Sequence, residues 1–143
     1  VDMVKSAIFS VDGCSVLTAS WDRTAKLWDA IAEECIRTFD HNDRMISASF
    51  SADGCSVLTA SEDMTAKLWD TITGECISTF DDNDRVRSAA FSADGCSVLT
   101  LTGMTTAKLW DAIIGECIRT FVEHDVLTSA CFCPDEYLCA NID

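Results

Sequence analysis

The stretch DGCSVLTAS begins at Asp12 and occurs again, letter for letter, at Asp53. Its first seven letters, DGCSVLT, return at Asp94. The string AKLWD recurs with the same spacing, beginning at Ala25, Ala66 and Ala107. Successive copies lie 41 residues apart, which indicates repeated units that bury their apolar faces by stacking on one another.

Each repeat is predicted to form four short strands, and the pattern is clearest in the second copy. Strands are expected at 45–50, 56–61, 65–70 and 75–80, where β-branched and aromatic residues are frequent. The Asp-Gly pair at 53–54 and the Thr-Gly pair at 73–74 are turn signals between them. Helical periodicity is weak and the chain has a single Pro, so helical repeats are not favoured.

The repeats are expected to cover approximately 2–42, 43–83 and 84–124, with a partial fourth copy over 125–143. Phe132 takes the place that Phe9, Phe50 and Phe91 have in the earlier copies. The segment CPDEYLCANID that follows resembles FSADGCSVLTASED after a two-residue deletion. The chain, 1–143, is therefore predicted to be one array of about three and a half repeats.

The period, the four strands, the Trp-Asp pair and the Phe-Ser-x-Asp-Gly turn together resemble the WD-repeat family. In that family each repeat supplies one four-stranded antiparallel blade of a β-propeller. The resemblance implies an all-β fold and a partial propeller of about three and a half blades. Because such an array does not close a ring, we expect either a segment of a longer chain or a subunit completed by a partner protein or a second copy.

The family's blades carry a hydrogen-bonded tetrad that joins a His, a Ser or Thr, an Asp and the Trp. The resemblance implies a complete tetrad in the second repeat, formed by His41, Ser61, Asp63 and Trp69. The first repeat retains Ser20, Asp22 and Trp28. The residue types suggest nucleophilic catalysis, but the family uses them for blade rigidity and nothing else supports a catalytic triad, so an enzyme is not expected.

The third repeat departs from the tetrad pattern. It keeps Thr102 and Trp110, but Asp82 stands where the His is expected and Met104 where the Asp is expected. A polar group buried without a partner costs about 1–3 kcal/mol. The third blade is therefore predicted to be the least stable.

The family also implies a binding face around the central channel, formed by three positions in each blade. In successive repeats these positions are Met3, Lys5 and Trp21; Arg44, Ile46 and Glu62; Arg85, Arg87 and Gly103; and Val126, Thr128 and Ile142. They differ between copies whose DGCSVLT and AKLWD scaffold is almost constant, as expected either of a binding face or of drift at exposed sites. The set holds four of the chain's ten cations and one Trp, residue types that favour interfaces.

The formal net charge of −14 opposes the binding of nucleic acid, because a phosphate backbone would be repelled. The charge serves either solubility or a basic partner such as a Lys/Arg-rich tail. No apolar run approaches the ~20 residues that span a bilayer, so membrane insertion is not expected.

Nine cysteines raise the question of disulfides and metals. Six occupy equivalent repeat positions, too far apart to pair, and are expected to be small buried hydrophobes of a reducing, intracellular and most naturally cytoplasmic protein. The others, Cys131, Cys133 and Cys139, lie near His124. A Cys-x-Cys pair on a strand lacks the turn of a zinc knuckle, so no metal or cofactor is expected.

The sequence thus favours a protein-interaction scaffold within a larger assembly. Two alternatives stay open. One is a reader of acidic or phosphorylated peptides, in which Arg side chains on the channel face supply bidentate contacts. The other is a purely structural repeat subunit.

Overall fold

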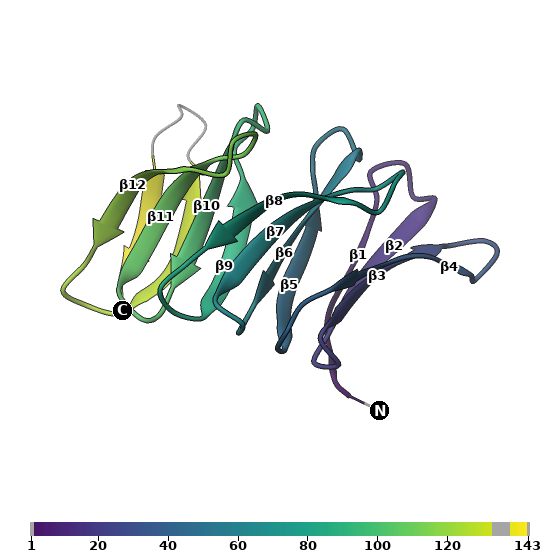
Figure 1. The fold of residues 1–143 in the computed structure, drawn as a ribbon, viewed down its shortest axis with the longest axis horizontal. Coiled ribbons are helices and arrows are strands. Elements are labelled where there is room, and N and C mark those ends of the chain that lie inside the picture. The colour runs from purple at the N-terminus through teal and green to yellow at the C-terminus, as the bar shows by residue number, and fades with distance from the viewer. Residues whose placement is uncertain (1, 133–137, 143) are drawn as a thin grey trace.

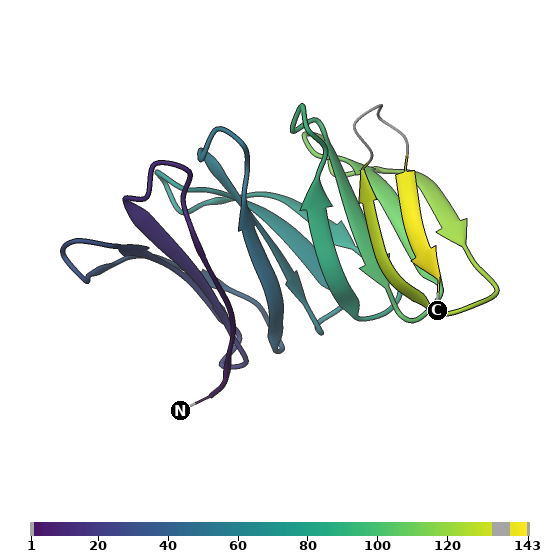
Figure 2. The ribbon, with the colours of Figure 1, turned by 180° about the vertical axis from the view of Figure 1, so that it is seen from behind.

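The computed structural model describes residues 2–132 and 138–142, and it describes side chains as far as residue 132. These residues form three four-stranded antiparallel sheets and one two-stranded sheet, with no helix among them. The sheets stand side by side in chain order, so that the two chain ends lie at opposite ends of the row (Figure 1; Figure 2 from behind). We number the sheets as blades one to four. The predicted partial propeller of about three and a half blades is confirmed.

The strands of each blade are consecutive in the chain. Blade one comprises β1 (Val4–Phe9), β2 (Ser15–Ser20), β3 (Thr24–Asp29) and β4 (Cys35–Asp40). Blade two comprises β5 (Met45–Phe50), β6 (Ser56–Ser61), β7 (Thr65–Asp70) and β8 (Cys76–Asp81). Blade three comprises β9 (Val86–Phe91), β10 (Ser97–Thr102), β11 (Thr106–Asp111) and β12 (Cys117–Val122). Blade four comprises β13 (Leu127–Phe132) and β14 (Leu138–Ile142).

The strands of blade two agree closely with the sequence prediction. β5, β6 and β7 have the expected bounds, whereas β8 begins at Cys76, one residue later than expected. Glu75 belongs to the preceding turn, because its carbonyl accepts a hydrogen bond from the Asp70 N–H at 2.9 Å.

The Asp-Gly turns have the same local geometry in blades one, two and three. In blade two, Asp53 Oδ1 accepts hydrogen bonds from the Ser51 hydroxyl at 2.6 Å and the Cys55 N–H at 2.9 Å. Gly54 follows with a φ of 73°, in the left-handed region that glycine adopts without a steric cost. Antiparallel order places these turns and the turns between third and fourth strands at one edge of the blades, which we call the Asp-Gly edge.

The opposite edge carries the turns between second and third strands and the connections between blades, and we call it the Trp21 edge.

No helix among the described residues is long and apolar enough to cross a membrane.

The core lies between blades rather than within them. The face of blade one that includes Leu17, Leu27 and Phe39 packs against Val57 and Trp69 of blade two in a single buried cluster. The rings of Phe39 and Trp69 lie 5.3 Å apart between centroids. A second cluster repeats this arrangement between blades two and three, with the rings of Phe80 and Trp110 5.7 Å apart.

The two ends of the row are less covered than its middle. Val4 is 59% exposed, whereas Met45 and Val86, at the same position in blades two and three, are fully buried. At the other end, Phe121 of blade three is only half-buried, although Phe39 and Phe80 are fully buried. On this side of blade three, the packing shown by the described side chains comes from β13.

This gradient of burial predicts unequal costs for equivalent substitutions. We expect Phe80→Ala to lower the free energy of unfolding by about 3–5 kcal/mol, because it opens a cavity between blades two and three. Phe121→Ala should cost less than about half of that, because solvent already reaches this ring. Urea titrations of both variants would test the comparison, and equal losses would contradict interblade packing as the main source of stability.

Candidate functional site

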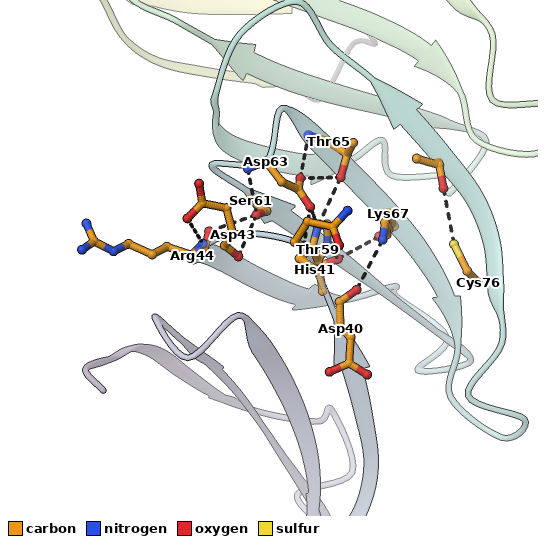
Figure 3. A network of polar contacts seen from close by, with 12 residues as sticks. Asp40, His41, Asp43, Arg44, Thr59, Ser61, Asp63, Thr65, Lys67 and Cys76 are labelled. Atoms are coloured by element: carbon orange, nitrogen blue, oxygen red, sulfur yellow. Dashed lines mark hydrogen bonds and ion pairs between the residues drawn. The ribbon is translucent and has the colours of Figure 1, made fainter. Parts of the chain in front are cut away.

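Blade two contains a continuous series of buried hydrogen bonds that ends at a carboxylate, and Figure 3 shows its part from Thr59 through His41 to Asp63. The Trp69 indole N–H donates to Thr59 Oγ1 at 2.8 Å, and Thr59 Oγ1 lies 2.8 Å from His41 Nε2. His41 Nδ1 lies 2.9 Å from Asp63 Oδ2. If His41 Nδ1–H donates to Asp63, its Nε2 accepts from Thr59, and every polar atom of the chain is satisfied. The chain fixes the third strand of the blade to the residues that precede its first strand.

The hydroxyl of this chain is Thr59 and not the expected Ser61, so the tetrad assignment of Ser61 is corrected. Ser61 instead accepts a hydrogen bond from the Asp63 N–H at 3.1 Å and donates to the carbonyls of Asp43 and Arg44. Thr59 and Ser61 share one strand face, and Trp69 lies opposite Val57. Its ring reaches the diagonal neighbour Thr59, whereas Ser61 lies one pair further on.

Blade one follows the same correction. The Trp28 indole N–H donates to Thr18 Oγ1 at 3.0 Å, while Ser20 Oγ accepts from the Asp22 N–H at 3.2 Å. Asp22 Oδ1 accepts from the Thr24 hydroxyl at 2.6 Å and so shapes the turn.

Blade three has a different series of buried hydrogen bonds, and this series is complete. Trp110 donates to Thr100 at 2.9 Å, and Thr100 and Thr102 donate to Asp82 Oδ2 at 3.1 and 2.5 Å. Lys108 Nζ lies 2.5 Å from Asp82 Oδ1, and both side chains are largely buried. Asp82 therefore replaces the His and has three side-chain partners. The expected orphaned groups, on which the predicted weakness of this blade rested, are not found among these residues.

The titration of the blade-two chain follows from its burial. Burial lowers the pKa of His41 below its ordinary value and outweighs the attraction of Asp63. Burial acts to raise the pKa of Asp63, but hydrogen bonds from Thr65 and the Asn42 N–H, together with His41, hold it below its ordinary value. His41 is consequently neutral and Asp63 ionised near pH 7.

A second group of polar residues gathers at the Trp21 edge. In each of the first three blades, one backbone hydrogen bond joins two of the predicted binding positions. The pairs are Trp21 N–H to Met3 O (2.9 Å), Glu62 N–H to Arg44 O (3.0 Å) and Gly103 N–H to Arg85 O (3.1 Å). Positions almost 20 residues apart in sequence thus lie together in each blade.

Trp21 forms a cluster with two of the predicted cations. Lys5 Nζ lies 5.1 Å and the Arg44 guanidinium carbon 4.7 Å from the Trp21 ring centroid, within the range of cation–π attraction. Arg44 comes from blade two, so the cluster bridges blades one and two. Trp21 Nε1 is buried and has no hydrogen-bond partner within the described part of the chain.

A pocket of about 500 Å³ lies at the same edge between blades two and three. Predicted binding positions supply five of its lining residues, namely Ile46, Glu62, Arg85, Arg87 and Gly103. The others are Asp84, Val86 and Met104, so the lining carries both signs of charge. A Cβ at Gly103 would lie 2.7 Å from Asp84 Oδ2, so a side chain there would displace Asp84.

Arg87 links this pocket to blade four. Arg87 NH2 donates to the Leu127 carbonyl at 2.5 Å, while its Nε is buried and unpartnered among the described residues. Val126 and Thr128 flank Leu127 on the chain and are exposed. The side chain of Ile142 lies outside the described part of the structure.

The comparison with protein families agrees with this geometry. The model of the WD domain, G-beta repeat, matches residues 2–29 and 33–70. The first two repeats of the chain therefore match the WD-repeat family. The third repeat carries the same AKLWD string and the same strand order. A comparison with curated proteins gives no match.

The WD-repeat tetrads are poorly placed for catalysis. Thr59 is fully buried, so its hydroxyl is out of reach of a substrate. WD-repeat chains are typically interaction scaffolds without enzymatic activity.

The cysteines of the WD repeats are not where the sequence predicted them. Burial was expected for the six at equivalent repeat positions, but all six are free and exposed: Cys14, Cys35, Cys55, Cys76, Cys96 and Cys117. Cys131 is also free and exposed. Cys14, Cys55 and Cys96 lie in the Asp-Gly turns, and Cys35, Cys76 and Cys117 begin the outer strands. Apolar pattern alone did not distinguish turn and edge positions from core ones. Cys133 and the side chain of Cys139 lie outside the described residues.

The buried pair in blade three predicts a large cost for removing its anion. Asp82→Ala should lower the free energy of unfolding by about 3–5 kcal/mol, because Lys108 would be left buried without a counter-charge. Asp81→Ala is a matched control, since Asp81 is the exposed neighbour of Asp82 and should change stability by at most about 0.5 kcal/mol. Chemical denaturation measures both, and a loss below about 1 kcal/mol for Asp82→Ala would refute the structural role of the pair.

The lowered pKa of His41 predicts a loss of stability in mild acid. Below about pH 6.5 the unfolded chain protonates this His while the folded blade keeps it neutral, so the unfolded state binds more protons. The free energy of unfolding should fall as pH drops from 6.5 towards the lowered folded pKa, by at most about 1.4 kcal/mol per pH unit for one proton.

Denaturation between pH 5 and 7.5 would test this dependence. His41→Asn should flatten it, whereas His124→Asn should retain it because His124 is exposed. A slope that survives in His41→Asn would assign the effect to another group.

Proposed function

We propose that this chain is a protein-interaction scaffold that binds a segment of a partner protein at the Trp21 edge. The observation that carries the proposal is the gathering of the positions that vary between otherwise near-identical repeats. They meet at one edge, around a pocket of about 500 Å³ and a Trp stacked with two cations. A concave site with apolar walls and a few convergent polar groups is the usual form of a binding site.

The Trp21 cluster supports an anionic group on the partner. The ring orders the Arg44 guanidinium, and an ordered guanidinium loses less freedom when it pairs with a carboxylate or phosphate. An acidic or phosphorylated peptide is therefore the finer form of the proposal.

The pocket between blades two and three limits how acidic the partner segment is. Glu62 and Asp84 line it beside Arg85 and Arg87, and Arg87 is already engaged with Leu127 O. A uniformly acidic peptide would be repelled by these carboxylates. We infer a segment with its anionic group over Arg44 and Lys5 and a neutral or apolar part in the pocket.

One feature of the structure supports a second partner in addition to this peptide, and another supports a reducing environment. The face of blade one that carries Val4 is exposed and is suited to packing against a further blade. That blade would come from a partner protein, a second copy or more of the same chain. Free, exposed thiols persist most readily in an intracellular compartment.

Binding of matched synthetic peptides would test the peptide-binding proposal. The probes are labelled peptides that alternate Leu with Glu, with phosphoserine, with Gln or with Lys, and the readout is fluorescence anisotropy. We expect the Glu or phosphoserine peptide to bind best. Arg44→Glu should weaken that binding by roughly tenfold or more, because it reverses the charge that contacts the anion. Trp21→Leu should weaken it as well, since it removes the aromatic platform.

Arg119→Glu is the control, because Arg119 lies on β12, the outer strand of blade three, away from the cluster, and carries the same change of charge. If Arg44→Glu and Arg119→Glu weaken binding equally, the effect comes from the net charge of the protein and not from a contact at the Trp21 cluster. Identical binding of all four peptides would reject the preference for an anionic partner.

A further inference from the structure

A groove of about 470 Å³ lies at the Asp-Gly edge between blades one and two, on the side of the molecule opposite the Trp21 edge. Its apolar walls come from both blades. Val11, Leu27 and Ile36 belong to blade one, and Phe50 and Ala52 belong to blade two. Val11 is 86% exposed and Ile36 is also exposed, so the groove holds apolar surface that no described residue covers.

The charge in the groove has one sign. Asp12 and Asp53 line it, and no Lys or Arg stands among the described residues that do. Hydrogen bonds from Ser10 and the Cys14 N–H hold the pKa of Asp12 below its ordinary value, and Ser51 and the Cys55 N–H do the same for Asp53. Both carboxylates are therefore ionised throughout the physiological range.

Arg37, the neighbour of Ile36 in the chain, is already engaged in hydrogen bonds. Arg37 donates from NH1 to the Ile36 carbonyl at 2.8 Å and from Nε to the Ile72 carbonyl at 3.1 Å, and its NH2 also contacts Ile72 O. These bonds tie the outer strand of blade one to the turn of blade two. Exposed Ile72 follows Thr71, which lines the groove.

We propose that this groove binds a basic segment of a partner protein, distinct from the segment bound at the Trp21 edge. One apolar side chain of the segment packs between Val11, Ile36 and Phe50. Flanking Lys or Arg side chains pair with Asp12 and Asp53. Charge complementarity selects this occupant, because the carboxylates stand beside the apolar walls and the whole chain carries −14.

A membrane surface is a poorer fit for the same site. Anionic lipid head groups would be repelled by Asp12 and Asp53. The apolar walls are moreover arranged as a concave groove and not as a protruding apolar face that enters a bilayer.

Anisotropy titration of the full chain with a labelled peptide tests the proposal. The probe has one central Leu with two Lys on each side, and two matched probes replace the Leu with Ser or the Lys with Glu. We expect saturable binding of the first probe only, weakened by added salt because exposed charge pairs are screened. Absence of saturable binding by the first probe, or equal binding of the Ser probe, overturns the proposal.

The chain offers closely matched variants. Asp12→Asn and Asp53→Asn together remove both charges and keep the Oδ1 acceptor that holds each turn, so the fold is retained. This double variant should weaken binding roughly tenfold. Asp94→Asn is the control, because Asp94 makes the same two hydrogen bonds in blade three, with Ser92 and Cys96, at 2.6 and 2.9 Å. If Asp94→Asn has the same effect as the double variant, the site is not the groove.

Val11→Ala tests the apolar wall, and the fold tolerates it because Ala52 and Ala93 hold this position in the other repeats. It should weaken binding of the first probe by roughly threefold to tenfold.

Vesicles of phosphatidylcholine with phosphatidylserine are the last probe. Binding to them that is lost in Val11→Ala would overturn the proposal in favour of a membrane. The Trp21→Leu variant should bind the basic probe normally, so failure at one edge is distinguishable from failure at the other.

Discussion

The structure depends on the packing of one blade's Leu and Phe face against the Val and Trp face of the next. A blade buries little on its own, and Leu17, Phe39 and Trp69 become buried together only when two blades meet. Apolar burial contributes about 25 cal/mol per Å², so most of the stabilisation arises between repeats. This dependence explains why Val4, which has no preceding blade among the described residues, is exposed while its counterparts are buried. It also explains why the repeat scaffold varies so little.

In blades two and three, the Trp joins this packing to the buried hydrogen bonds. Trp69 contacts Phe39 through its ring and donates its N–H to Thr59, so one side chain joins the blade interface to the hydrogen bonds of His41 and Asp63. Blade three achieves the same connection with Asp82 and Lys108, two charges that compensate each other. The buried Thr hydroxyl that receives the Trp N–H needs an acceptor of its own. That acceptor can be a neutral His, as in blade two, or a carboxylate with a counter-ion, as in blade three. This freedom allows the repeats to diverge without losing the fold.

Because packing and polar chains fix the interior, the two edges of the blades are free to differ. The Trp21 edge concentrates the residues that change between copies, and its exposed groups include both signs of charge. The Asp-Gly edge is nearly constant, acidic and partly apolar. A row of blades therefore offers two surfaces with different chemistry, one specific to each blade and one repeated. Such a division suits a scaffold that holds more than one segment at a time.

The sequence alone determined the period, the four strands of each repeat and the turns, because these follow from local patterns that recur at a fixed spacing. The residues expected at the Trp21 edge came from the resemblance to the WD-repeat family. It did not determine which hydroxyl receives the Trp N–H, since Thr59 and Ser61 share a strand face and only the cross-strand register separates them. Nor could it show that Asp82 is compensated by Lys108, or that the cysteines are exposed, because both depend on neighbours across strands and blades. Tertiary structure decided these points, for burial and pairing are properties of the assembled blades.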